Sequence, residues 1–545
     1  MLRTDHLSPY VTIVWRSVVL NNFLIRALAS PESGRQEFQY DGAGNMVQKT
    51  TSVLRQQGRV IKYTYDGFNR MVEIDYPFSQ DVSLTYGQPG STDNTAGRLL
   101  SRTDQSGTVS FSYGLLGEQT GKTQTLNRMA LNAEEKTVSF SYTSDYLGRM
   151  QEIIYPTGEI VRYGYDEGGQ VTSVTGERNS LVTEYVQDIG YDEYGQRVYI
   201  KYGNGVETEY SYDPERRWLE SVHTVKGLEK YQDMNYSFDS VGNVTQMTNE
   251  AGRYSTTQNY GYDGLYQLTS AEGNYTSKPH GYTEYTGTYR QQFSYDTLGN
   301  IISKISNSSV NPSQSQAIGA QLNYSLDYSY YENAPNQAEI IGNSYYQYDA
   351  NGNLIMEREG GHGNIETGSA YGVQELEDGV NATGYGWGLD RSEEADKDDV
   401  YQRTYRWNEE NRLMAVESPE ALTEFRYNAD GERTHKKSGT FEETLYFDSM
   451  FSATTDIDVS DLRLSLHIYL GETRIATRLK MEDSFDYDTV YEQYNTYYYH
   501  SDHLGSAQLV TDYEGEEYEH IEYTPGCMPE QVPKAPARAL WRAMD

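Results

Sequence analysis

Apolar and aromatic residues alternate with polar ones over short stretches of most of the chain. In residues 161–165, for example, Val161, Tyr163 and Tyr165 occupy every second position. Successive side chains of a β-strand point to opposite faces, so this period of two predicts strands with one covered face. No segment shows the 3.6-residue period of a long amphipathic helix. The pattern therefore predicts an all-β protein.

A recurring motif punctuates this alternation. Two aromatic residues, separated by one variable residue, lead to an Asp, and a Gly follows that Asp three positions later. An Asp at the start of a turn accepts hydrogen bonds from backbone N–H groups two residues on, and Gly tolerates the left-handed conformation that closes the turn. We therefore expect hairpin turns at these Asp and Gly pairs: Asp41 and Gly44, Asp166 and Gly169, Asp192 and Gly195, Asp239 and Gly242, Asp296 and Gly299, and Asp349 and Gly352.

Second turns lie between the copies of the motif, as at residues 155–158 (Tyr-Pro-Thr-Gly) and 202–205 (Tyr-Gly-Asn-Gly). Each repeat is therefore about two strands and two turns. A single hairpin is marginally stable, so neighbouring hairpins must stack to cover their aromatic faces, which predicts a β-hairpin solenoid. Residues 307–320, rich in Ser, Asn and Gln, and residues 360–399, Gly-rich and acidic, interrupt the repeats, and we expect loop insertions there.

Composition narrows the function further. The chain has 53 Tyr against 13 Phe, so many phenol hydroxyls need hydrogen-bond partners. The formal net charge of −36 argues against nucleic-acid binding, which needs clustered Lys and Arg. Cys527 is the single cysteine and cannot form an internal disulfide. No window is apolar for the ~18 residues that a membrane-spanning helix requires, so we expect none.

Residues 1–35 precede the first repeat, and we interpret them as a leader. Apolar stretches and the small residues Ala27 and Ala29 are features of a signal peptide, whereas Arg16 and Asn21 interrupt them. A signal peptide and a disordered leader both remain open.

The repeats resemble those of the Rhs or YD-repeat family. The segment Asp502, His503, Leu504, Gly505 and Ser506, preceded by three tyrosines, resembles the core segment associated with Rhs repeats. The resemblance implies a repeat shell over residues 36–479 and the start of the core over residues 480–525. It also implies the fold: a long β-sheet wound into a hollow or partial shell, as in bacterial insecticidal toxin complexes and the teneurin barrel.

The end of the chain departs from the family pattern. Toxin relatives carry paired Asp-Pro-x-Gly segments for self-cleavage, but the only Asp-Pro pair here is Asp213-Pro214, inside a repeat. After Pro525 the composition turns to Ala, Pro and Arg. We expect residues 526–545 to be an aberrant, truncated or frame-shifted tail, and self-cleavage is not carried over.

Candidate chemistry is sparse. His500, Asp502 and His503 are possible metal ligands, and the neighbouring Ser501 and Ser506 suggest a hydrolase. Adjacent strand residues point to opposite faces, however, and no third converging element is identifiable, so a strand and turn are the simpler interpretation. Asp-rich turns match neither the spacing of an EF-hand nor that of a calcium β-roll. We assign no catalytic residue, metal ligand or cofactor.

These observations predict a non-catalytic structural shell, in a toxin or cell-surface system, that encloses or presents a polypeptide cargo or joins another toxin-complex subunit. The alternative is a wall- or surface-associated adhesin that binds glycans or a receptor on exposed aromatic faces. Both place the protein outside the cell or at its surface. If the acidic charge lines the lumen, it favours a basic cargo.

Overall fold

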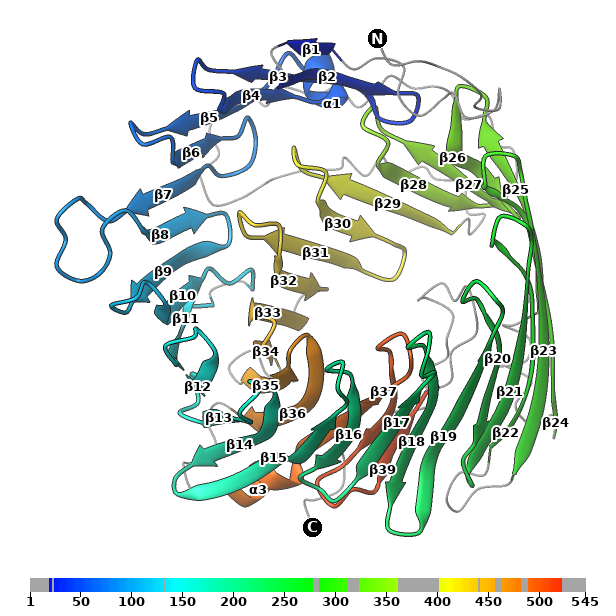
Figure 1. Ribbon diagram of the computed structural model, residues 1–545. Coiled ribbons are helices and arrows are strands. Elements are labelled where there is room, and N and C mark those ends of the chain that lie inside the picture. Colours follow the sequence, from blue (N-terminus) through cyan, green and yellow to red (C-terminus); the bar gives the residue numbers. More distant parts are fainter. Residues whose placement is uncertain are drawn as a thin grey trace.

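A computed structural model describes residues 19–21, 24–130, 133–277, 284–311, 323–360, 401–439, 442–455, 462–481 and 489–521. These residues form one 39-stranded sheet in which each strand runs antiparallel to the next strand along the chain (Figure 1). The prediction of an all-β solenoid is confirmed.

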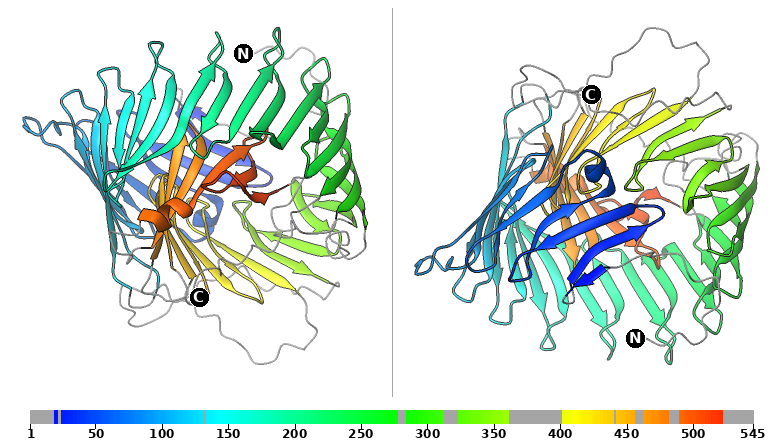
Figure 2. Two further views of the ribbon diagram at one scale, coloured as in Figure 1. Left: turned by 90° about the horizontal axis from the view of Figure 1, so that it is seen from below. Right: turned by 90° about the horizontal axis from the view of Figure 1, so that it is seen from above.

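The sheet curls into a ring and then continues inside it (Figures 1 and 2). We call β1–β26 the first pass and β27–β39 the second pass. The strands of the first pass are β1 (Val19–Asn21), β2 (Leu24–Ser30), β3 (Gly34–Tyr40), β4 (Met46–Thr50), β5 (Ile61–Tyr65), β6 (Met71–Asp75), β7 (Val82–Tyr86), β8 (Leu99–Asp104), β9 (Gly107–Tyr113), β10 (Gln119–Leu126), β11 (Lys136–Ser144), β12 (Met150–Ile154), β13 (Ile160–Tyr165), β14 (Val171–Arg178), β15 (Leu181–Tyr191), β16 (Arg197–Tyr202), β17 (Glu207–Tyr212), β18 (Leu219–Lys226), β19 (Glu229–Phe238), β20 (Val244–Glu250), β21 (Tyr254–Tyr262), β22 (Leu268–Ser277), β23 (Tyr285–Tyr295), β24 (Ile301–Asn311), β25 (Tyr324–Tyr331) and β26 (Ala334–Ile341).

The second pass starts where the ring has returned to its beginning. Its strands are β27 (Ser344–Tyr348), β28 (Leu354–Glu359), β29 (Gln402–Trp407), β30 (Leu413–Glu417), β31 (Leu422–Tyr427), β32 (Arg433–Ser438), β33 (Glu442–Asp448), β34 (Phe451–Thr455), β35 (Leu462–Leu470), β36 (Thr473–Met481), β37 (Thr496–Ser501), β38 (Ala507–Thr511) and β39 (Glu517–His520). In the described part of the chain, two short helices, α1 (Ser52–Gln56) and α3 (Thr489–Tyr494), interrupt the strands. No helix in the described ranges has the length and apolarity needed to cross a membrane.

Most of the repeat turns have one local geometry, and the turn that starts at Asp213 is one residue longer. In the turn after β13, the N–H of Asp166 donates to the carbonyl of Gln170 (2.9 Å) and the N–H of Gly169 donates to the carbonyl of Asp166 (3.1 Å). Gly169 has φ +88°, in the left-handed region. This is a hairpin loop closed by a glycine bulge, and it bends and twists the sheet at each repeat.

Alternation of strand direction gives the ribbon two edges. Turns that follow odd-numbered strands lie at one edge, which we call the Asp rim because the turns that start at Asp41, Asp166, Asp239 and Asp349 lie there. Turns that follow even-numbered strands, such as residues 155–158, lie at the other edge, which we call the second rim. The turn that starts at Asp512 follows β38 and lies at the second rim.

Two expected boundaries are wrong. The sheet begins at Val19, before the expected start at residue 36, because the hydroxyl of Tyr40 donates to the carbonyl of Ile25 (2.9 Å) and Ala27 is only 3% exposed. The expected loop insertion at 307–320 begins later, because β24 continues to Asn311 in register with β23. Residues 312–320, most of the expected insertion at 360–399, and the tail at 526–545 lie outside the described residues.

The core lies between the two passes. Its largest cluster joins the inner face of β10–β19 to β33–β38. The rings of Phe140 and Phe451 meet edge to face with centroids 6.0 Å apart, and those of Tyr202 and Tyr498 meet likewise at 6.1 Å. The ring is therefore held by burial of the second pass against the first.

Candidate functional site

The candidate site is the contact between the two passes, which we call the seam. Among the described residues it joins the second rim of the first pass to turns, strands and helix α3 of the second pass. At its start, the N–H of Val53 in α1 donates to the side chain of Asn351, in the turn after β27 (2.9 Å). Each later hairpin then meets a hairpin of the other pass.

The next pair of turns is held by a carboxylate. Glu409, in the turn after β29, is 6% exposed and accepts hydrogen bonds from the N–H of Phe78 (2.9 Å), the N–H of Ser79 (2.7 Å) and the Ser79 hydroxyl (2.6 Å). Its neighbour Glu410 forms an ion pair with Lys49 (2.6 Å). The carboxylates of this turn therefore take up donors that the turn after β6 would otherwise leave unpaired.

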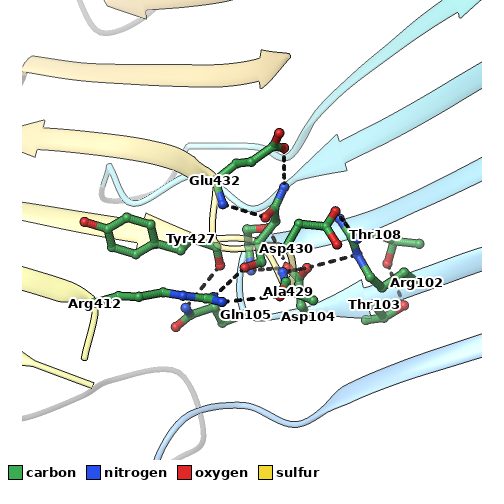
Figure 3. Close-up of polar contacts among 12 residues, drawn as sticks. Arg102, Thr103, Asp104, Gln105, Thr108, Arg412, Tyr427, Ala429, Asp430 and Glu432 are labelled. Atoms are coloured by element: carbon green, nitrogen blue, oxygen red, sulfur yellow. Dashed lines mark hydrogen bonds and ion pairs between the residues drawn. The ribbon is translucent and has the colours of Figure 1, made fainter. Parts of the chain in front are cut away.

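A third pair of turns is shown in Figure 3. Arg102, on β8, forms an ion pair with Asp430, in the turn after β31. The N–H of Ala429 donates to the carboxylate of Asp104 (2.8 Å), and the side chain of Gln105 donates to the carbonyl of Tyr427 (3.1 Å). Two side chains of the first pass thus bond to the backbone of the second pass, which fixes the register of the two turns.

Farther along, the seam buries full charges. Glu159 is 1% exposed, and both of its carboxylate oxygens accept hydrogen bonds from Arg478, at 3.0 Å and 3.1 Å. The Tyr185 hydroxyl donates to the same carboxylate, and Arg478 also donates to the Thr183 hydroxyl (2.7 Å). Burial raises the pKa of Tyr185 well above its ordinary value, so this phenol remains a donor.

A second buried carboxylate, Glu443, lies at the start of β33. It is 1% exposed and accepts from Arg128 (3.0 Å) and from the N–H of Met129 (2.5 Å). Buried charges of this kind require complete pairing, so they specify one relative position of the two passes.

The family core motif lies near the end of the seam, which continues to the turn after β38, where the side chain of Asn204 donates to the carbonyl of Asp512 (2.8 Å). In the turn after β37, Asp502 accepts from the N–H groups of Leu504 and Ser506, both at 2.9 Å, and Gly505 has φ +83°. The ring of His503 lies against Tyr236 of the first pass, with centroids 4.7 Å apart. This segment therefore forms a repeat turn whose histidine contacts the wall.

The three residues considered as metal ligands do not converge. His500 is buried beside the ring of Tyr202 (centroids 4.6 Å apart) and bonds to the Thr511 hydroxyl (2.9 Å), away from the Asp502 turn. Among the described residues, no group of three His, Cys, Asp or Glu side chains is placed to hold a metal ion. A surface hollow of about 470 Å³ lies over β21–β24, and its charged lining residues are Glu272 and Arg290.

The acidic charge of the wall faces outward. The face of β10–β19 that contacts the second pass carries buried apolar residues such as Val161 and Ile200. Because side chains alternate along a strand, the other face carries the strand carboxylates Asp75, Glu152, Glu177, Glu207, Glu209 and Glu272. The condition on which a basic cargo was expected, acidic charge that lines the lumen, is therefore not met by these strands.

Sequence reasoning missed how the repeat tyrosines connect neighbouring hairpins. The hydroxyl of Tyr165, just before its turn, donates to the carbonyl of Met150, the first residue after the preceding turn (2.6 Å). The same bond joins Tyr65 to Met46, Tyr191 to Val171, Tyr212 to Arg197, Tyr262 to Val244, and Tyr295 to Leu268. Trp407 makes it with its indole N–H, to the carbonyl of Leu354 (2.6 Å). The aromatic residue before each Asp is the signal that could have revealed this ladder.

Comparisons with known proteins agree with the repeat and the fold. The RHS Repeat family model matches residues 145–180. Toxin subunit YenC1 of Yersinia entomophaga is 28% identical over 38% of this chain and 26% of its own length. Toxin subunit YenC2 of the same organism is 27% identical over 48% of this chain and 28% of its length. The tRNA nuclease WapA of Bacillus subtilis is 26% identical over 42% of this chain and 10% of its length.

Solved structures show the same fold. The Photorhabdus luminescens Tc holotoxin pore has a TM-score of 0.70 at 19% identity, over 92% of this chain and 24% of that chain. The TcdB2-TccC3 crystal structure has a TM-score of 0.64 at 17% identity, over 92% of this chain and 25% of that chain. The chain thus spans about a quarter of the length of these toxin relatives and neighbours. In its repeat motif, its wound sheet and these matches, the chain is similar to proteins of the Rhs/YD-repeat family.

Proposed function

We propose that the chain is a non-catalytic wall of a toxin-complex shell that encloses a polypeptide. The observation that carries this proposal is the seam, in which paired turns and buried ion pairs hold the second pass inside the ring. A ribbon used only for surface display would not need buried charges to close it on itself. The proteins named toxin subunits that it resembles support the assignment to a toxin complex.

A structural role also accounts for the side chains that offered chemistry. His500 contacts Tyr202, Asp502 caps a turn, and Glu159 and Glu443 neutralise arginines of the other pass. The nuclease activity in the name of WapA is not carried over, because this chain aligns with 10% of that protein and its wall presents carboxylates outward. By the same resemblance we propose secretion and a further toxin-complex subunit as partner.

The test is protection of a reporter peptide from protease. An unstructured, protease-sensitive peptide is fused after Asp545, and its cleavage rate is compared with that of the free peptide. Enclosure predicts cleavage slower by at least about tenfold, because the protease must wait for the wall to open. The matched control is the same fusion with Arg478→Met, which breaks the seam and should restore fast cleavage.

Cleavage of the intact fusion at the rate of the free peptide would contradict enclosure. If the same protein then bound a glycan array, the adhesin alternative would replace the shell.

A further inference from the structure

The first pass carries a row of exposed apolar residues along its Asp rim. They share one position, the second residue after the first residue of the turn, and their exposed fractions run from 49% to 75%. They are Phe68, Leu116, Leu147, Tyr194, Val241, Leu265 and Leu298. Large apolar side chains aligned on one edge form a surface that water solvates poorly, and such surfaces mark interaction sites.

The second pass shows what this turn position does. There the equivalent residues are Asn351, Glu410 and Asp430, in the turns after β27, β29 and β31. Each one bonds across the seam, to the N–H of Val53, to Lys49 and to Arg102 respectively. In these three turns, the second residue after the turn's first residue is therefore the contact residue by which one edge of the sheet sits on another, whereas Leu504, at the same position after β37, is 78% exposed.

From this equivalence we propose that the Asp rim of the first pass is a docking edge for the same rim of a second copy of the chain. The first pass places apolar residues where the turns after β27, β29 and β31 place polar ones, so the occupant must present an apolar edge. Where the row is continuous, as from Val241 to Leu298, neighbouring tips are two strands or about 10 Å apart, and an edge built from the same repeat has the same spacing. Gly168 and Glu215 interrupt the row. The Asp rim of another copy provides both properties, and a two-fold axis would pair it with itself.

Charge does not prevent this contact. Asp66, Asp145 and Asp192 lie behind the tips, and each pairs with an arginine: Arg70, Arg149 and Arg217 respectively. The net charge of −36 on each copy still opposes association at long range, and salt screens that repulsion. Dimerisation should therefore strengthen as ionic strength rises, the opposite of what an interface made of ion pairs would show.

The contact area is adequate for a stable dimer. Counting Leu115, Tyr146 and Tyr266 as well, the rim exposes ten large apolar side chains. At roughly 100 Å² each they offer on the order of 1,000 Å² per copy, against the ~800 Å² per partner of a standard interface. Two partial shells joined along this rim would share one enclosed space. The inference concerns the outer edge and does not depend on cargo enclosure.

Sedimentation velocity of the full chain, over a roughly hundredfold range of concentration and at low and high salt, tests the proposal. We expect a monomer–dimer equilibrium that shifts toward dimer at high salt. The triple variant Leu116→Ser, Leu147→Ser and Val241→Ser should weaken dimerisation by at least about tenfold. Leu265→Glu alone should also weaken dimerisation, because it places like charges in the contact. This single substitution keeps the test valid if the triple variant does not fold.

Leu228→Ser is the matched control, because Leu228 is fully exposed but lies in the turn after β18, on the second rim. It should dimerise as the wild type does. A wild-type chain that stays monomeric at every concentration and salt overturns the proposal, and so does a dimer that the rim variants leave unchanged. Flotation of a monomeric chain with phosphatidylcholine vesicles, abolished by the same variants, would overturn it in favour of a lipid surface.

Discussion

One nitrogen of Arg478 donates to both carboxylate oxygens of Glu159, at 3.0 Å and 3.1 Å, across 319 positions of sequence. Both side chains are at most 5% exposed. An ion pair between residues so distant in sequence, and so completely buried, forms only when the second pass lies in one position inside the first. It therefore joins the local repeat chemistry to the closure of the ring.

Removing one member of this pair should destabilise the protein strongly. Arg478→Met leaves the Glu159 carboxylate buried without its cation, at an expected cost of about 3–5 kcal/mol of unfolding free energy. Arg162→Met is the matched control, because Arg162 pairs with Glu152 and Glu177 at the outer face with its side chain 42% exposed. That change should cost about 0–1 kcal/mol. Urea unfolding followed by tyrosine fluorescence compares the two, and equal midpoints would contradict a closed seam.

Acid should weaken the seam through its buried histidines. Burial lowers the pKa of His500 and of His435 to about 3, and that of His467 to about 4. The ordinary value is 6.5, so the unfolded chain takes up protons first and stability falls as pH drops below about 6.5, with the loss complete near pH 3. Protonation of His500 would also place a proton on Nδ1, which has no hydrogen-bond partner in the described chain.

His500→Gln tests whether protonation of His500 contributes to the loss of stability at low pH. The glutamine can still bond to the Thr511 hydroxyl but cannot take up a proton, so the decline in unfolding free energy between about pH 7 and pH 5 should be smaller by about 2 kcal/mol. Urea unfolding at each pH measures it. The contrary result is an unchanged slope with pH, which would mean that His500 is accessible to water in the folded protein.

The tyrosine ladder predicts a selective effect of losing one hydroxyl. Tyr165→Phe keeps the ring but leaves the Met150 carbonyl without its donor, so it should cost about 1 kcal/mol. Tyr146→Phe, at an 81% exposed turn tip, should cost nothing measurable. Thermal unfolding of both variants gives the comparison, and similar melting temperatures would show that the ladder bonds contribute no net stability.

The effect of substituting Gly505, in the core motif, should depend on its left-handed backbone conformation rather than on side-chain packing. Gly505 has φ +83°, and an added Cβ would meet no atom within 4 Å. Asn69 and Asn411 adopt φ +61° and +60° in related turns, so Gly505→Asn should be mild. Gly505→Val, with a branched side chain in the same conformation, should lose about 1–3 kcal/mol. Equal stability of the two variants would contradict this turn geometry.

The repeats made the fold predictable, whereas the seam was hidden. Alternation and the Asp and Gly spacing are local signals, and they lead directly to antiparallel hairpins. The pairing of Glu409 with Phe78 and Ser79 depends on how far the ribbon curves, which no window of sequence encodes. The sequence left the direction of the acidic charge open for the same reason, because the inner face is defined only once the second pass is in place. Strand β2 was missed because it precedes the first repeat motif. Its contact with that motif is the hydrogen bond from the Tyr40 hydroxyl to the carbonyl of Ile25.

The winding of the ribbon is the central claim, and hydrogen exchange of residues 76–81 tests it most directly. The N–H groups of Phe78 and Ser79 donate to Glu409 on the other pass, so this turn should exchange at least about tenfold more slowly in the wild type than in Glu409→Ala. A wild-type turn that exchanges as fast as the variant would mean that the second pass does not sit on the first, and the shell would have to be abandoned.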